Sequence, residues 1–152
     1  MGIQQDIKIK EFKSSFQKAI VNIFFTSNWL RDQQAHIYKT YGLLPQHYNV
    51  LRIIKGRNPE SISPGEILDV MIDKGRDLTR LVDKLVKKGL VKRHGCPINR
   101  RKVNIYVTPK GVKLSDEIEG EMAKWAKQFA NIPEEDAEQL SLILDKLRTK
   151  KD

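Results

Sequence analysis

The segment from Ser63 to Lys113 constrains the fold of this chain more than any other stretch. It begins with SPGEILDVM and KGRDLTRLVDKLVKKG, in which apolar residues recur at helical spacing. It continues with LVKRHGCPINRRKVNIYVT, which has β-branched residues in alternation on both sides of a basic loop. A capped helix, a turn, an amphipathic helix and a strand–loop–strand unit, in that order, predict a winged helix-turn-helix. That fold places one helix in a DNA groove and a basic loop beside it.

The positive charge of the chain is concentrated in the same segment. Residues 61–113 hold 13 of the 28 basic residues but only five of the 19 acidic ones, a net charge of +8, whereas the rest of the chain has a net charge of +1. A charge that served solubility alone would be spread along the chain. A local excess is expected of a surface that displaces counterions from phosphates. Double-stranded DNA is therefore the predicted partner.

Local signals set the expected bounds of the two helices. Ser63 and Glu66 form a capping-box pattern around Pro64, and Asp73 in the following turn is a candidate cap for the second helix. We expect this second helix, the recognition helix, to cover about residues 75–88. The apolar positions of the two helices predict a set of buried side chains: Ile67, Leu68, Met71, Leu78, Leu81, Val82, Leu85 and Val86.

Further elements are predicted on both sides of this pair. Residues 7–41 have apolar residues at spacings of three and four and predict a long helix, in one piece or two, that ends at Gly42. Its Phe-rich face is either an ordinary core face or one shared with a dimer partner. Ser61-Ile62 is expected to pair briefly as an edge strand. Thr108-Pro109 begins another long helix, and a last helix with an acidic first turn follows it.

Three segments resemble the MarR (multiple-antibiotic-resistance regulator) family of bacterial transcription factors. They are YGLLPQHYNVLRII, LTRLVDKLVKKGLVKR and NRRKVNIYVTPKG, which are similar to the family's second-helix segment, recognition helix and wing. The resemblance covers roughly residues 10–148, and the ordered set is more specific than any one segment. It implies an obligate homodimer that binds a pseudo-palindromic operator. Many members are repressors released by small phenolic or other aromatic ligands.

The resemblance also implies how the chain is divided. The fold expected is mainly α with a small β wing, a winged helix-turn-helix with dimerisation helices at both ends. Residues 1–42 would form the N-terminal dimerisation helix and residues 114–152 the C-terminal ones. Residues 43–113 would form the DNA-binding domain, with the wing at residues 90–108.

Two positions depart from the family pattern. Asn99 stands where the family has an acidic wing residue that helps to hold the wing through a salt bridge. An amide hydrogen-bonds but carries no charge. Members that sense oxidants often carry a reactive cysteine near the N-terminus, whereas the single cysteine here, Cys96, lies in the wing. A thiol-responsive regulator acting through Cys96 is an alternative, and an incidental cysteine in an exposed loop is the simpler interpretation.

Eight side chains are candidates for contact with DNA: Lys74, Arg76, Thr79, Arg80, Lys84, Arg100, Arg101 and Lys102. Arginines at the start of the recognition helix suit base edges, because the guanidinium pairs bidentately with guanine. The two wing arginines suit a narrow minor groove, and the lysines suit phosphates. The alternatives are a solvated surface pair in the wing and local pairing with Asp77 or Asp83 on the helix.

Five aromatic side chains form a candidate ligand site between the dimerisation helices and the winged helix: Trp29, His36, Tyr38, Tyr41 and His47. Aromatic walls with a few polar tips suit a small aromatic effector. Core packing accounts for most of these positions equally well. No histidine has a second ligand at metal spacing, so the sequence predicts neither a metal nor a cofactor.

Other function classes have little support in the sequence. Because it lacks a Gly-rich phosphate loop, a nucleophile elbow and a His-Glu metal helix, we predict that the chain is not an enzyme. A winged-helix protein-interaction module without specific DNA binding is the competing function, and the local basic excess argues against it. The N-terminal residues lack the apolar run of a secretory signal, and residues 19–25 are too short to span a bilayer. We therefore expect a cytoplasmic protein with no membrane partner.

Overall fold

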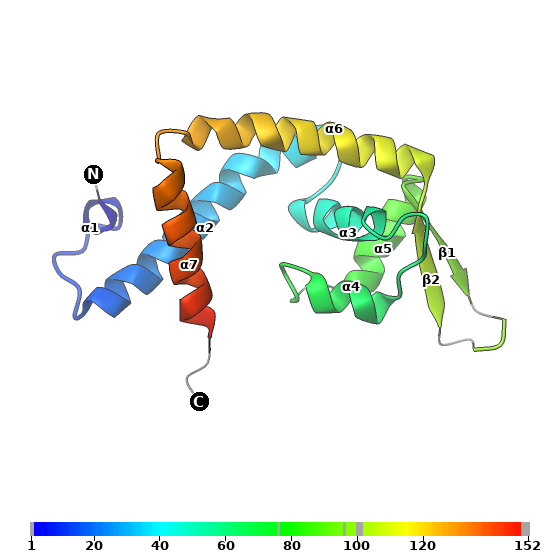
Figure 1. Cartoon of the computed structure of the whole chain (residues 1–152), viewed down its shortest axis with the longest axis horizontal. Coiled ribbons are helices and arrows are strands. Elements are labelled where there is room, and N and C mark those ends of the chain that lie inside the picture. The colour runs from blue at the N-terminus through cyan, green and yellow to red at the C-terminus, as the bar shows by residue number, and fades with distance from the viewer. Residues whose placement is uncertain (1, 76, 96, 100–101, 150–152) are drawn as a thin grey trace. The chain divides into compact units, whose positions relative to one another are not determined.

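The computed structural model describes residues 2–75, 77–95, 97–99 and 102–149 (Figure 1). Contacts divide the chain into two compact units, Met1–Ser115 and Asp116–Asp152. The described residues are mainly helical, with one two-stranded antiparallel sheet, as the sequence predicted. No helix among them has both the length and the hydropathy needed to cross a membrane.

The first unit begins with a short helix, α1 (Ile3–Asp6), and the long helix α2 (Ser15–Thr40). Our prediction of helix from residue 7 was wrong at its start, because residues 7–14 are not helical. The side chain of Ser14 accepts a hydrogen bond from the backbone N–H of Gln17 and caps α2 at that point. The predicted end is confirmed, because Gly42 has a φ of +66°, the left-handed conformation that glycine adopts just past a helix.

Three helices and a hairpin form the winged helix-turn-helix. The helices are α3 (Pro45–Lys55), α4 (Pro64–Val70) and α5 (Leu78–Lys87), and Figure 1 shows them grouped beside the β1–β2 hairpin. The capping box predicted at Ser63 and Glu66 begins α4. The core contains fully buried side chains from all these elements: Val50, Leu51, Ile54, Ile67, Leu85, Leu90 and Ile105.

Two side chains predicted to be buried are not: Leu68 is exposed and Val86 is half-buried, and the predicted cap of the recognition helix was also wrong. Leu68 is 39% exposed, because Ile67 and Met71, one turn apart, form the buried stripe of the short α4 and Leu68 lies about 100° around the helix from Ile67. The cap of the recognition helix is Asp77, not Asp73. The carboxylate of Asp77 accepts hydrogen bonds from the backbone N–H groups of the second and third helical residues, so α5 begins at Leu78 and not near residue 75.

The hairpin pairs β1 (Val91–Gly95) with β2 (Val103–Val107) in antiparallel register, with Val91 opposite Val107. Ile62 forms a single bridge with Ile105, and the two backbones exchange N–H to O hydrogen bonds of 2.9 and 3.0 Å. The brief edge strand predicted at Ser61-Ile62 is therefore confirmed at Ile62. It attaches the outer side of β2 to the loop between α3 and α4.

The base of the hairpin is joined to the start of α6 (Pro109–Ala126). The Thr108 hydroxyl donates to the Gly89 carbonyl (2.6 Å), and the Thr108 N–H donates to the Leu90 carbonyl (3.0 Å). Gly111 N–H donates back to the Thr108 hydroxyl at 3.1 Å, as expected of a helix cap. A Cβ added at Gly111 would lie 2.0 Å from the Leu90 carbonyl oxygen. Only glycine fits at this crossing.

The second unit contains the later turns of α6, a 3-10 turn η1 (Lys127–Phe129) and α7 (Glu134–Arg148). Trp125 and Phe129 pack edge to face, with ring centroids 4.8 Å apart. The acidic first turn predicted for the last helix is confirmed in α7. This helix leaves a series of large apolar side chains exposed: Leu140, Leu142, Ile143 and Leu147.

Candidate nucleic-acid interface

Helix α5 presents a polar face to solvent because its other face belongs to the core. Leu78, Leu81, Val82 and Leu85 are buried, whereas Thr79, Arg80 and Lys84 are exposed. The side chain of Arg80 is 87% exposed, and its Nε lies 3.5 Å from the carboxylate of Asp77. An exposed pair of this length is weak, so the guanidinium keeps its hydrogen-bond donors for a partner. Three of the eight predicted DNA-binding side chains therefore share one exposed helix face.

The remaining predicted DNA-binding residues lie outside this helix. Lys74 precedes α5, and its ammonium group donates to the Asp69 carbonyl at 3.1 Å near the end of α4. Lys102 is exposed just before β2. Arg76, Arg100 and Arg101 lie outside the described residues, as does Cys96, so these predictions stay as the sequence left them.

Two polar contacts that the sequence reasoning missed fix the position of α5. Asn49, on α3, is 9% exposed, and its side-chain oxygen accepts a hydrogen bond from the backbone N–H of Ile72 at 3.1 Å. This bond holds the turn between α4 and α5. At the other end, the Lys88 ammonium donates to the Tyr41 carbonyl at 3.2 Å, which joins the C-terminus of α5 to the end of α2. A polar residue inside the apolar face of α3 was the available signal for Asn49.

The two faces of the hairpin have different partners. Lys92, His94 and Tyr106 gather on one face, where the Lys92 ammonium and the His94 ring each lie 5.8 Å from the centre of the Tyr106 ring. Arg93 belongs to the other face, and its Nη1 lies 2.6 Å from Oδ1 of Asp83 on α5. From the sequence, Asp83 was a candidate for pairing within its own helix, whereas its partner in the structure is Arg93 of β1.

Two of the five candidate ligand residues are engaged within the winged helix and its junction with α2. Tyr38 is buried with its ring 5.4 Å from that of Tyr48, and burial raises the pKa of Tyr38 to about 12. His47 Nδ1 accepts a hydrogen bond from the Leu44 N–H at 2.9 Å, so it caps α3. Burial, followed by the positive charges of Lys84 and Lys88, lowers the pKa of His47.

The other three candidate ligand residues are more accessible. Trp29 and His36 are exposed on α2, and Tyr41 is half-buried at its end. The described contacts do not bring all five side chains into one pocket. Tyr41 and His47 nevertheless both neighbour the C-terminal part of α5, through the Lys88 hydrogen bond and through the charges around His47.

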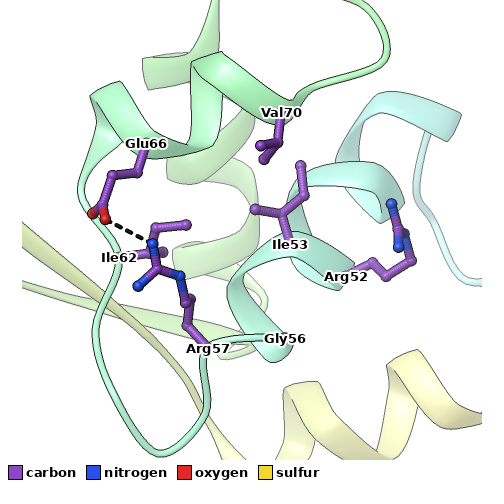
Figure 2. Close-up of a pocket in the computed structure, with 7 residues that line it drawn as sticks. All are labelled: Arg52, Ile53, Gly56, Arg57, Ile62, Glu66 and Val70. Atoms are coloured by element: carbon purple, nitrogen blue, oxygen red, sulfur yellow. Dashed lines mark hydrogen bonds and ion pairs between the residues drawn. The ribbon is translucent and has the colours of Figure 1, made fainter.

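A pocket of about 330 Å³ lies on the α3–α4 side of the winged helix (Figure 2). Arg57 spans it and pairs with Glu66 at 2.7 Å, and Figure 2 shows Arg52 directed away from this pair. The backbone and side chain of Ser63 donate to Glu66, and these bonds, with the Arg57 charge, lower the pKa of Glu66. The ion pair thus braces the cap of α4. None of the five candidate ligand residues is among its lining residues: Arg52, Ile53, Gly56, Arg57, Ile62, Glu66 and Val70.

Comparison with known proteins agrees with this geometry. Residues 43–111 match the family described as the winged helix DNA-binding domain. The HTH-type transcriptional regulator PecS of Dickeya dadantii (strain 3937) is 28% identical over 83 residues, which cover 54% of this chain and 50% of PecS. The chain thus aligns with about half the length of PecS. Fold and exposed helix face together define a winged helix DNA-binding domain.

Solved structures extend the similarity beyond that domain. A MarR transcription factor from Planctomyces limnophilus has 28% sequence identity and a TM-score of 0.69, covering 89% of this chain and 98% of its own. A mutant MarR from E. coli complexed with operator DNA has 21% identity and a TM-score of 0.72, covering 98% of this chain and 100% of its own. The chain thus has a winged helix DNA-binding domain, and over most of its length its fold is that of MarR-family transcriptional regulators.

Proposed function

We propose that this chain is a homodimeric repressor that binds a pseudo-palindromic operator in double-stranded DNA. In this proposal α5 enters the major groove and the loop of the hairpin lies over the adjacent minor groove. One observation carries it: Thr79, Arg80 and Lys84 project together from a helix whose other face is core. They lie in the segment that holds a net charge of +8. The similar E. coli MarR, whose structure contains operator DNA, supports the same use of the fold.

The side chains have different roles in this proposal. Thr79 and Arg80 lie in the first turn of α5, where a recognition helix contacts base edges, and Arg76, which precedes them in the sequence, is proposed to act with them. The lysines at positions 74, 84 and 102 neutralise phosphates and set the position of the domain without selecting sequence. Arg100 and Arg101 contact the minor groove and its phosphates.

The homodimer is proposed because each unit exposes a row of apolar side chains. On α2, Phe16, Ile20 and Phe24 follow one another at intervals of four residues, and Phe16 and Phe24 are 81% and 66% exposed. On α7, Leu140, Ile143 and Leu147 form a second row. Rows of this kind are costly in water and are typical of an interface. A second copy of the chain, carrying the same two rows, would cover them.

A small aromatic ligand is proposed to release the DNA. The support is the connection between the α2–α3 junction and α5: Lys88 bonds to the Tyr41 carbonyl, and Lys84 and Lys88 lie close enough to influence His47. A ligand that displaced Tyr41 would therefore act on the recognition helix. Release of bound DNA by a hydroxybenzoate at millimolar concentration, with no release by an aliphatic acid of similar size, would support this part.

The test of the main proposal is selection of duplexes from a random library, followed by titration at several salt concentrations. A repressor predicts a two-fold symmetric consensus and affinity that falls steeply with salt, because phosphate contacts release counterions. It also predicts two chains per duplex by light scattering, and lower expression of a reporter placed behind the selected site. Recovery of no consensus would contradict the proposal and favour a protein-interaction module.

A further inference from the structure

In the described part of the chain, one ion pair joins the β1–β2 hairpin to α5. It is formed by Arg93, in the middle of β1, and Asp83, in the middle of α5. Asp83 follows Thr79 by four residues and therefore lies one turn further along the same side of the helix. The pair thus connects the helix face that carries the proposed DNA contacts to the strand that leads into the loop of the hairpin.

The pleat of the strand explains why Arg93 is directed at the helix. Successive side chains of a strand point to opposite faces, so Arg93 shares a face with Val91, which is 2% exposed. It lies opposite Ile105, which is also buried. Its neighbour Lys92 has the opposite direction and lies over the Tyr106 ring. A charged side chain on the inner face, next to core residues, is available to bind a carboxylate on the packed helix.

The two strands of the hairpin are attached in different ways. β2 is held through its backbone by the bridge between Ile105 and Ile62, and the base is held by Thr108. On the side of β1 that faces α5, the ion pair is the polar attachment that the structure shows. The direction of the loop therefore depends on how β1 is fixed to the helix.

We propose that Asp83 and Arg93 are positioning residues, which set the angle at which the hairpin carries its loop toward the DNA beside the α5 contact. The inference rests on the proposed function, since it concerns binding to an operator. Their side chains are 43% and 38% exposed, so the pair adds little to global stability. Its effect is on the angle between α5 and the β1–β2 hairpin, the two elements proposed to contact DNA. Each of them is already held in the fold by other contacts.

Replacing each residue of the pair by an uncharged one, as in Asp83→Asn and Arg93→Gln, separates this positioning role from a simple effect of charge on DNA binding. Asp83→Asn removes a negative charge from the DNA-facing side, which by itself should strengthen binding to a polyanion. If the pair positions the hairpin, Asp83→Asn should instead weaken binding to the selected duplex by roughly three- to tenfold, and Arg93→Gln by a similar factor. Lys92→Gln is the matched control, since it removes the same charge from the opposite face of β1.

Two readouts complete the experiment. Hydroxyl-radical footprinting on the selected duplex should show loss of protection in the flanking minor groove for Asp83→Asn and Arg93→Gln, with the central protection kept. On a shortened duplex that lacks the flanks, both variants should bind as tightly as the wild type. Hydrogen exchange without DNA should be faster in the hairpin and unchanged in α3, with the melting temperature maintained.

Three outcomes would overturn the inference. Tighter binding by Asp83→Asn would show that Arg93 is a phosphate contact restrained by Asp83. An unchanged flanking footprint in both variants would show that the pair has no effect on the hairpin. Equal losses of affinity in Arg93→Gln and Lys92→Gln would show that Arg93 contributes only its positive charge. If the wild type selects no duplex, the proposed function fails as well. A wild type that binds while the variants behave normally refutes the positioning role alone.

Discussion

The winged helix buries its large apolar side chains, whereas the helices before and after it in the sequence leave many of theirs exposed. Within α3, α4 and α5, large aliphatic side chains such as Leu51, Ile67 and Leu85 are fully buried in a single chain. On α2 and α7, rows that include Phe24 and Leu140 remain in solvent. The first region is complete as a folded unit, whereas we propose that the second is completed by another copy. Substitutions that distinguish a closed core from an open face therefore test both statements.

The largest effect is expected from Gly111→Ala, at the junction that closes the winged helix. The new Cβ would lie 2.0 Å from the backbone oxygen of Leu90, and a backbone atom cannot move aside as a flexible side chain does. We expect a loss of about 4 kcal/mol or more in the free energy of unfolding, measured by urea denaturation. Gly120→Ala is the control in the same helix, because nothing lies within 4 Å of a Cβ added there. It should stabilise the protein by about 0.5–1 kcal/mol. Similar losses of unfolding free energy in both variants would be inconsistent with a close approach of Gly111 to the Leu90 carbonyl.

Leu→Ala at two positions compares the closed core with the open face directly. Leu85→Ala removes a side chain with no exposed surface and should lower the free energy of unfolding by about 2–5 kcal/mol at every protein concentration. Leu140→Ala removes a side chain that is 52% exposed in one chain. It should act through assembly, so that stability becomes more dependent on concentration and light scattering shows more monomer. A concentration-independent loss for Leu140→Ala would argue against the dimer face.

A smaller effect is expected when the proposed DNA contacts on α5 and beside the wing are replaced. Arg80→Ala should reduce specific affinity by about 1–3 kcal/mol and relax the preference at one base pair of each half-site. Lys102→Ala should weaken binding to all duplexes alike and lower the salt slope by about one. Competition titrations with single-base variants of the selected duplex distinguish the two patterns. Equal relaxation by both variants would show that the helix has no special part in sequence selection.

The smallest effect concerns the pH dependence of the core near His47. Its pKa in the folded chain is lowered from 6.5, chiefly by burial. As the pH falls through about 6.5, the unfolded state takes up a proton that the folded state does not, so stability decreases and the loss is complete below the folded pKa. His47→Gln keeps an acceptor for the Leu44 N–H but does not titrate. The decrease in urea midpoint between about pH 7.5 and 5.5 should therefore be smaller in this variant than in the wild type.

A second replacement at the same position separates capping from titration. His47→Ala removes the acceptor as well, and should be about 1 kcal/mol less stable than His47→Gln at both pH values. If His47→Gln kept the full pH dependence of the wild type, the acid sensitivity would belong to other groups. If His47→Ala were as stable as the wild type, the hydrogen bond to Leu44 would have no value as a cap.

Most of the winged helix follows from local patterns in the sequence. The capping box at Ser63, the glycine at 42 and the alternation in both strands identify the elements and most of their bounds. These signals act within a few residues of each other, so a single sequence contains them. The charge excess and the exposed side of α5 were likewise visible as a pattern of polar and apolar positions.

The contacts that fix the candidate site were less predictable, because they join residues that are distant in sequence. Packing brings Asn49 close to Ile72 and Lys88 close to Tyr41. The sequence around one residue of a pair does not identify its partner. The choice of Asp77 over Asp73 as the cap also depended on where the turn ends. Both carboxylates suit the position, and the backbone geometry decides between them.

The hydrogen bond from Lys88 to the Tyr41 carbonyl has a consequence for the architecture of the operator. It couples the end of α5 to the end of α2, a helix of 26 residues with no internal glycine or proline. Such a helix is about 39 Å long and bends little. In a dimer it would therefore help to fix the distance between the two recognition helices. We expect substitutions near Phe16, far from α5 along this helix, to alter the preferred spacing of half-sites. The bases selected within each half-site should stay the same.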